Sequence, residues 1–169
     1  MNHLSRCLLL PFLTIACSSD EAVLVFPKQM TVVPELAETA ITATDLWHAA
    51  APELYGIKEL TIADECSGPG YCVIAVDAVP GSATAYGYFD GNRTFMIKRN
   101  LREDWRVSTL AHEIGHSLGL EHRVGVLMDP DRSSADRENP CVDTDMLEAL
   151  DVCGVPTCLF DITEIDYVP

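Results

Sequence analysis

Apolar residues recur at helical spacing across residues 34–51, and this pattern predicts the first helix of the chain. Positions three or four residues apart share one face of a helix. The apolar residues on this face are Leu36, Ala40, Ala43 and Trp47. Pro34 suits the first turn, where its missing N–H would have no partner, and Pro52 ends the helix. His48 falls in the last turn, where the helix dipole favours a cation.

Short segments on both sides of this helix in the sequence predict β-strands. They are rich in Val, Ile and aromatic residues or alternate between apolar and polar positions. The predicted strands are residues 23–26, 57–63, 73–79, 82–89 and 94–98. Asp90, Gly91 and Asn92 mark a turn between the last two strands. We therefore expect at least one hairpin among the strands that follow the first helix.

The second half of the chain carries two further predicted helices. One covers about residues 104–118, and the other covers residues 143–150, with Asp143 as its cap and acidic residues in its first turn. Between them, residues 131–140 are polar and are predicted to form a loop. Helices and strands in this order predict an α+β fold.

Length and charge limit the kind of protein. We find no internal repeat, and about 150 of the 169 residues follow residue 17, which suits one domain with a real core. The chain has a formal net charge of −15 at pH 7. So acidic a surface argues against binding nucleic acid or anionic phospholipid. We expect a monomer that acts on a peptide or protein substrate.

The first 16 residues are predicted to be a signal peptide, because one positive charge at Arg6 precedes a short apolar run. That run is too short to cross a membrane as a permanent helix. Residues 14–17 resemble a bacterial lipobox, with Thr14 where leucine is more usual. The resemblance implies cleavage before Cys17, lipidation of its thiol and a lipid anchor as the one contact with the membrane. Residues 17–22 would then be a tether to a domain spanning residues 23–169.

The predicted signal peptide and lipobox indicate where in the cell the protein is located. Ser18 after the lipidated cysteine would favour the bacterial outer membrane or cell surface over the inner membrane. Ordinary secretion, or release into the periplasm, is the alternative. In either case the domain works outside the cytoplasm, where disulfides persist. Cys66 and Cys72 bracket a turn-rich loop that a local disulfide can close, and two of the three residues Cys141, Cys153 and Cys158 can form another.

The chemistry of the chain is concentrated in residues 112–122, HEIGHSLGLEH. His112 and His116 lie four residues apart, so both imidazoles can face one metal ion from a helix. Gly119 can adopt a positive φ, which ends the helix and brings His122 round as a third ligand. Glu113 is turned away from the ligands but can reach a water on the metal. Three protein ligands leave one position open, as at a catalytic zinc.

This motif and the residues after it resemble those of the metzincin metallopeptidases. Met128 falls six residues after His122, in the sequence Leu-Met-Asp-Pro, which looks most like the matrixin branch and its bacterial relatives. The resemblance implies a single metzincin-type domain: a twisted mixed sheet, an N-terminal helix, a zinc-binding active-site helix, a Met-turn beneath the metal and a C-terminal helix. Met128 would lie in that turn as a hydrophobic base for the imidazoles.

The resemblance also implies the reaction. One catalytic zinc would polarise the scissile carbonyl, and Glu113 would act as general base in an endopeptidase. Matrixins bind structural calcium as well, and carboxylates that can supply oxygen ligands are Asp77, Asp90, Asp129, Asp131 and Asp136. The alternative function is a non-catalytic zinc-containing surface lipoprotein that acts as a binding module. The carboxylate of Glu113 argues against it, because metal binding alone does not need that group.

Two regions are candidates for binding substrate. By resemblance, a strand at the edge of the cleft pairs with the substrate backbone, and the candidate segment is Ala83-Thr84-Ala85-Tyr86. Matrixins form one pocket wall from a Pro-x-Tyr segment, and this chain has Pro130, Asp131 and Arg132 there. We hypothesise that Arg132 favours acidic substrate side chains. In the alternative reading, Arg132 points to solvent.

One more motif bears on regulation. Cys153-Gly-Val-Pro resembles the core of the matrixin cysteine switch, in which a propeptide thiolate occupies the open zinc position. In matrixins that segment precedes the catalytic domain, whereas here it follows the last predicted helix. Gly154 can equally be a helix cap, and Cys153 can equally be half of a disulfide.

Overall fold

A computed structural model describes residues 29–52, 59–152 and 154–163. The predicted signal peptide, Cys17, the tether and the strand predicted at residues 23–26 lie outside the described residues, as does Cys153. Within the described part, none of the helices has both the length and the hydropathy that crossing a membrane requires.

The centre of the fold is a five-stranded mixed sheet in the order β2-β1-β3-β5-β4. The strands are β1 (Gln29–Val32), β2 (Glu59–Ile62), β3 (Tyr71–Val76), β4 (Gly87–Phe89) and β5 (Thr94–Lys98). The first four strands of this order pair in parallel, and β4 pairs antiparallel to β5, with Tyr88 opposite Met96. As a result β4 forms one edge of the sheet.

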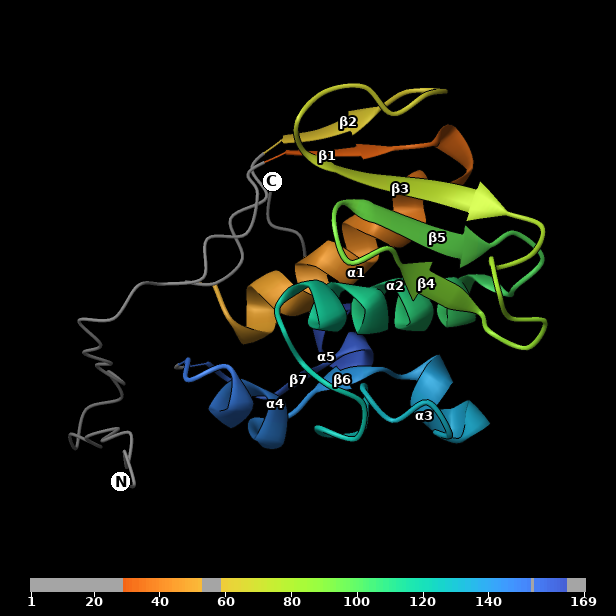
Figure 1. The fold of residues 1–169 in the computed structure, drawn as a ribbon. Helices are drawn as coiled ribbons and strands as arrows, with labels where there is room; N and C mark the ends of the chain where they lie inside the picture. Colours follow the sequence, from red (N-terminus) through yellow and green to blue (C-terminus); the bar gives the residue numbers. More distant parts are fainter. Residues whose placement is uncertain (1–28, 53–58, 153, 164–169) are drawn as a thin grey trace, which may run out of the picture.

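Two long helices cover one face of this sheet (Figure 1). A short 3₁₀ turn, η1 (Pro34–Leu36), leads into α1 (Ala37–Ala50), and α2 (Glu103–Ser117) packs beside α1. The indole Nε1 of Trp47 donates a hydrogen bond to the carbonyl of Ala111 at 3.0 Å, which joins the two helices inside the core. Fully buried side chains of this core include Met30, Val32, Leu36, Leu46, Trp47, Phe95, Ile97, Leu110 and Ile114.

The C-terminal part forms a smaller layer under the helices (Figure 1). It contains α3 (Ser134–Glu138), β6 (Cys141–Val142), α4 (Thr144–Ala149), β7 (Thr157–Cys158) and α5 (Leu159–Thr163), with β6 antiparallel to β7. Met146 of α4 is fully buried and joins the main core. The predicted α+β class is confirmed.

Two predictions of local structure were wrong. The strand predicted at residues 82–89 is limited to β4, because Ser82 Oγ accepts a hydrogen bond from the amide of Ala85 and makes a local turn. The loop predicted at residues 131–140 contains α3, which a capping box starts: Ser133 and Asp136 bond reciprocally through side chain and backbone. Both features lie beside the cleft described below.

Two disulfides join described cysteines. Cys66 pairs with Cys72, as predicted for the turn-rich loop. Cys141 pairs with Cys158 and links β6 to β7, which settles one pairing that the sequence left open.

The turn between β4 and β5 depends on Asp90. Its Oδ1 accepts hydrogen bonds from the amides of Asn92, Arg93 and Thr94 at 2.9, 2.8 and 2.9 Å. Burial alone would raise the pKa of Asp90, but these bonds together lower it below its usual value. A lowered pKa means that ionised Asp90 stabilises the fold above about pH 4 and loses this effect as the pH falls through the folded pKa.

We expect Asp90→Ala to lower the free energy of unfolding at pH 7 by about 1 kcal/mol, since several bonds to one exposed carboxylate are lost. Urea unfolding of wild type, the Ala variant and Asp90→Asn would measure this. The Asn variant keeps an acceptor and should fall between the other two. The difference between wild type and Ala should shrink from pH 7 to pH 2, and an unchanged difference would contradict the account.

Candidate metal centre

Helix α2 presents two histidines side by side. His112 and His116 are four residues apart, and their ring centroids are 4.7 Å apart. His112 is buried, and His116 is half-buried nearer the helix end. The helix therefore supplies two of the three predicted imidazoles at one place.

The end of α2 brings the third imidazole to the same place. The amide of Gly119 donates to the carbonyl of His116, and the amide of Leu120 donates to Gly115, each at 3.0 Å. This pair of bonds is a Schellman motif, and it needs a residue of positive φ, which Gly119 supplies at +94°. The chain then turns back, and the ring of His122 lies 4.6 Å from that of His116.

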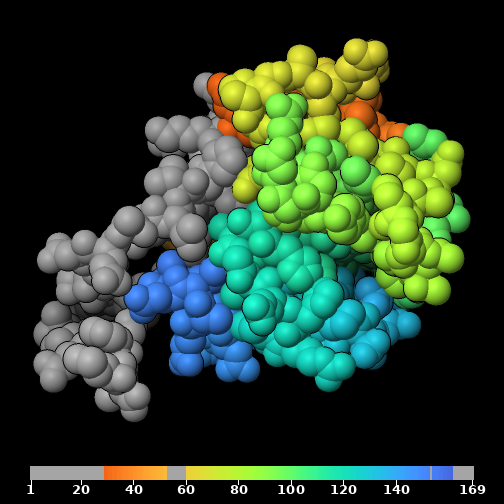
Figure 2. All heavy atoms as spheres, viewed as in Figure 1, coloured from red at the N-terminus to blue at the C-terminus, as the bar shows by residue number. Residues whose placement is uncertain are grey.

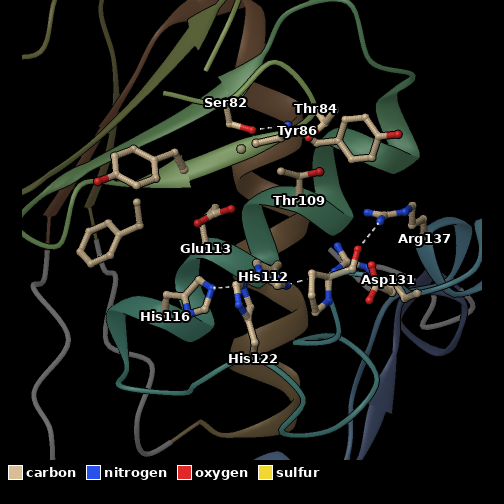
Figure 3. A pocket seen from close by; sticks show the side chains of 16 residues that line it. Ser82, Thr84, Tyr86, Thr109, His112, Glu113, His116, His122, Asp131 and Arg137 are labelled. Atoms are coloured by element: carbon tan, nitrogen blue, oxygen red, sulfur yellow. Dashed lines mark hydrogen bonds between the residues drawn. The ribbon is translucent and has the colours of Figure 1, made fainter. Parts of the chain in front are cut away.

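The three imidazoles form a group that can hold a metal ion. Their ligand atoms all lie within 4.8 Å of one another, and no other group of three or more metal-binding side chains converges in the described parts of the chain. The Nε2 atoms of His116 and His122 are 3.0 Å apart, close to the roughly 3.3 Å expected for two nitrogens on a tetrahedral zinc. Figure 3 shows the three rings meeting beside Glu113.

Hydrogen bonds at the opposite ring nitrogens orient these imidazoles. The Nδ1 atoms of His112 and His116 each lie 2.8 Å from a backbone carbonyl, that of Leu127 and that of Leu120 respectively. His112 Nδ1 also lies 3.0 Å from Arg132 Nη1, but that guanidinium nitrogen already donates to the Leu127 carbonyl at 2.8 Å. Because a carbonyl can only accept and is the nearer partner of each Nδ1, we assign the proton to Nδ1, which leaves the lone pair on Nε2. Burial lowers the pKa of His112 to about 3 and also lowers that of His116, so both rings are neutral, as metal ligands must be. This donor set fits zinc.

Met128 lies directly against the metal-site helix. It is fully buried, and its thioether sulfur lies where a Cβ on Gly115 would project. Gly115 stands between the two helical histidines, so its lack of a side chain lets Met128 pack under them. Met128 therefore packs against α2 at Gly115, and its role in a Met-turn stays a prediction.

Two hydrogen bonds hold the loop that carries Met128. The amide of Arg123 donates to the carbonyl of Met128, which closes the loop on itself. Asp143, which caps α4, also accepts a hydrogen bond from the amide of Val126 at 2.8 Å. A side chain on Gly125 would occupy the position of this carboxylate. Asp143 therefore connects α4, in the C-terminal layer, to the loop that carries Met128.

Glu113 lies next to the imidazoles without joining them. Its side chain is buried, and burial raises the pKa of its carboxyl to about 7, although a backbone hydrogen bond from Phe89 opposes the shift. Gly87 makes this position possible, because a Cβ there would overlap Thr109 and come within 3.0 Å of Glu113 Oε1. A carboxyl with a pKa near 7 can exchange a proton at neutral pH.

Arg132 does not point to solvent. It is 8% exposed and lies beneath His112, where its Nη1 donates to the carbonyl of Leu127 at 2.8 Å. Its Nη2 donates to the carbonyl and the hydroxyl of Ser108 at 3.1 and 3.0 Å. The alternative in which Arg132 is solvated is therefore wrong, and few of its donors remain for an acidic substrate. The position of Arg132 two residues after Pro130 in the sequence did not indicate that its side chain would be buried.

The metal centre opens into a cleft of about 800 Å³. Of the predicted substrate-binding residues, Thr84, Ala85, Pro130 and Arg132 line it, and Ala83 does not. The other lining residues are Ser82, Tyr86, Gly87, Tyr88, Phe89, Thr109, His112, Glu113, His116, His122, Asp131 and Arg137. Figure 2 shows the sheet residues above and the α2 and loop residues below on one face of the molecule.

Sequence reasoning placed Tyr86 in the candidate edge strand but did not find Arg137, which also lines the cleft. Arg137 lies in α3, and the signal that could have found it is the Ser133-to-Asp136 capping box. Tyr86 precedes β4, and its carbonyl accepts a hydrogen bond from the amide of Lys98. Both side chains come to the cleft only through long-range packing.

The acidic residues considered for calcium have partners within the protein. Asp77 pairs with Arg99, Asp131 pairs with Arg123, and Asp136 bonds Ser133 in the capping box of α3. The Oδ1 of Asp129 accepts a hydrogen bond from the amide of Asp131. Calcium binding stays a prediction.

The fold and the site together define the class of a zinc metallopeptidase: a mixed sheet, a helix with two histidines, a third histidine after a glycine turn, and a methionine beneath them. The profile of the matrixin peptidase family matches residues 58–152, which is more than half of the chain, and the chain belongs to that family. A search of curated proteins matched none of them.

Proposed function

We propose that this protein is an endopeptidase that cleaves peptide bonds at a zinc ion held by His112, His116 and His122. The observation that carries the proposal is the convergence of three imidazole nitrogens beside the buried Glu113 in an open cleft. When bound, zinc supplies Lewis acidity toward a peptide carbonyl and lowers the pKa of water. The family assignment supports zinc metallopeptidase activity in general.

Glu113 is the general base in this proposal. Its carboxylate would take a proton from the attacking water and deliver it to the nitrogen of the leaving amine. Burial raises the pKa of Glu113 to about 7, and a divalent cation at the neighbouring imidazoles would lower it again. The side chain would therefore be ionised at neutral pH and ready to accept the proton.

The edge strand β4 supports an endopeptidase over an exopeptidase. It ends the sheet, and its residues Gly87, Tyr88 and Phe89 line the cleft. An edge strand offers backbone groups that no neighbouring strand uses, so an extended peptide can add to it. A peptide lying along β4 would pass the metal centre with chain on both sides of the cleaved bond. The substrate-binding role predicted for residues 83–85 stays a prediction, and Thr84 and Ala85 line the same cleft.

We also propose that the enzyme acts outside the cytoplasm as a lipoprotein anchored through Cys17. The proposal rests on the signal and lipobox resemblance of residues 1–17. The two disulfides support it, because such bonds persist in oxidising compartments. Labelling with a palmitate analogue should tag wild type and leave Cys17→Ser untagged, and equal labelling would overturn this part.

Endopeptidase activity is tested with peptides blocked at both termini. The zinc-loaded protein should cleave them internally, chelator should stop the reaction, and added zinc should restore it. Mass spectrometry of the products locates each cleaved bond. Cleavage of unblocked peptides alone would replace the proposal with an exopeptidase, and a zinc-loaded protein that cleaves nothing would point to the binding module.

A further inference from the structure

Arg137 reaches the catalytic cleft from outside the metal-site helix. It lies in the last turn of α3, is half-buried and lines the same cleft as the three histidines. One nitrogen, Nη2, donates to the carbonyl of Pro130 at 3.0 Å. Figure 3 shows Arg137 at the end of the cleft near Asp131, with the imidazoles farther along.

Two aromatic rings hold the guanidinium in place. Its central carbon lies 4.9 Å from the ring centroid of Tyr86 and 5.5 Å from that of Trp105. The two rings contact each other edge to face at 5.5 Å. Cation–π contacts of this kind orient an arginine without using its hydrogen-bond donors. A pre-oriented arginine loses less conformational entropy when it binds a ligand.

No described carboxylate forms an ion pair with Arg137, although the chain carries a net charge of −15. Arg99, Arg102, Arg106 and Arg123 each pair with at least one acidic residue. The acidic residues nearest the cleft are engaged elsewhere: Asp136 bonds Ser133, Asp131 pairs with Arg123, and Glu113 is buried. A guanidinium has five N–H donors, so Arg137 keeps donors for a ligand.

We propose that Arg137 determines specificity by binding a carboxylate of the peptide substrate. The carboxylate is either an Asp or Glu side chain near the cleaved bond or the C-terminal group of the peptide, since both have the planar geometry that a guanidinium binds through two bonds. The sequence suggested Arg132 for binding an acidic side chain. Its Nη1 and Nη2 instead donate to backbone carbonyls beneath His112, so we assign this role to Arg137. The inference rests on the proposed peptidase function.

The test compares matched peptides. Blocked peptides carry Glu or Gln at each position flanking the cleaved bond, and a second set carries a free acid or an amide at the C-terminus. The proteins are zinc-loaded wild type, Arg137→Gln, Arg137→Lys, and Arg93→Gln as a control. Arg93 lies outside the cleft and bonds the carbonyl of Gly68, so this control removes the same charge elsewhere.

We expect wild type to prefer one carboxylate peptide by about tenfold in kcat/KM, the order of one charge-assisted hydrogen bond. The preference should vanish in Arg137→Gln, fall in Arg137→Lys and persist in Arg93→Gln. A Glu preference identifies a side-chain carboxylate, and a free-acid preference identifies the C-terminus. Equal cleavage of both peptides in both sets, or a preference that survives Arg137→Gln, would overturn the proposal.

A binding measurement separates this inference from the peptidase proposal. Fluorescence anisotropy records the affinity of the same peptides for zinc-loaded protein whether or not cleavage occurs. Tighter binding of the carboxylate peptides to wild type than to Arg137→Gln would support the inference even if no peptide were cleaved. Equal affinities for both peptides and both proteins would overturn it.

Discussion

Replacing Glu113 by Gln is expected to reduce kcat/KM for a blocked peptide by about 10²–10⁴-fold while zinc still binds at one ion per chain. The amide has nearly the same shape as the carboxylate but cannot accept the proton of the attacking water. Glu113 is not one of the three converging ligands, so its loss leaves the imidazoles in place. The Phe89 amide can still donate to the remaining carbonyl oxygen of Gln.

The measurement combines steady-state kinetics with zinc analysis of the same samples. Thr109→Val is a matched control, because Thr109 lines the cleft beside Gly87 but has no proposed proton-transfer role. It should keep most of the activity. If Glu113→Gln cleaved at the wild-type rate with zinc bound, Glu113 would not be the general base.

The second large effect is expected for Arg132→Met, which we predict to lower the free energy of unfolding by about 2 kcal/mol and zinc affinity by about 10–100-fold. Arg132 joins the carbonyl of Leu127, the residue before Met128, to Ser108 on α2. That same Leu127 carbonyl accepts the Nδ1–H of His112. Without the guanidinium, the carbonyl that orients His112 loses its second donor.

Two effects oppose each other at Arg132. Burial penalises the charge and lowers the pKa of Arg132 to about 10, so removal of the cation relieves a desolvation cost. The variant also loses the charge-assisted hydrogen bonds from the guanidinium to the backbone carbonyls of Leu127 and Asp129 and to the hydroxyl of Ser108. Each such bond contributes about 1.5–3 kcal/mol, so we expect the loss to exceed the relief.

Urea unfolding of the metal-free protein and competitive zinc titration would measure the two effects separately. Arg132→Lys keeps the charge and one donor group, so it should show a smaller loss in both. A variant Arg132→Met with wild-type stability and wild-type zinc affinity would show that the buried arginine does not support the site.

The metal-site geometry could be predicted from the sequence because it depends on local structure. His112 and His116 meet through helix periodicity, and Gly119 turns the chain by a motif complete within six residues. The elements that depend on local periodicity or on a short turn, such as α1 and the β4–β5 turn, were also predicted close to their observed bounds.

The cleft walls could not be predicted in the same way. The positions of Arg132 and Arg137 depend on contacts with Ser108, Tyr86 and Trp105, which are distant in sequence. Residues 131–140 were predicted to be a loop because they are polar, although the capping box that starts α3 can be recognised in the sequence. The pairing of Cys141 with Cys158 likewise depends on the β6–β7 ladder and not on spacing.

The central claim is that the three imidazoles hold one zinc ion on which peptide cleavage depends. The most direct test is titration of zinc into metal-free protein while cleavage of a blocked peptide is recorded. The account predicts that activity rises from zero and saturates at one zinc per chain, and that His116→Ala gains no activity over the same range. Full activity in the metal-free protein, or undiminished activity in His116→Ala, would contradict it.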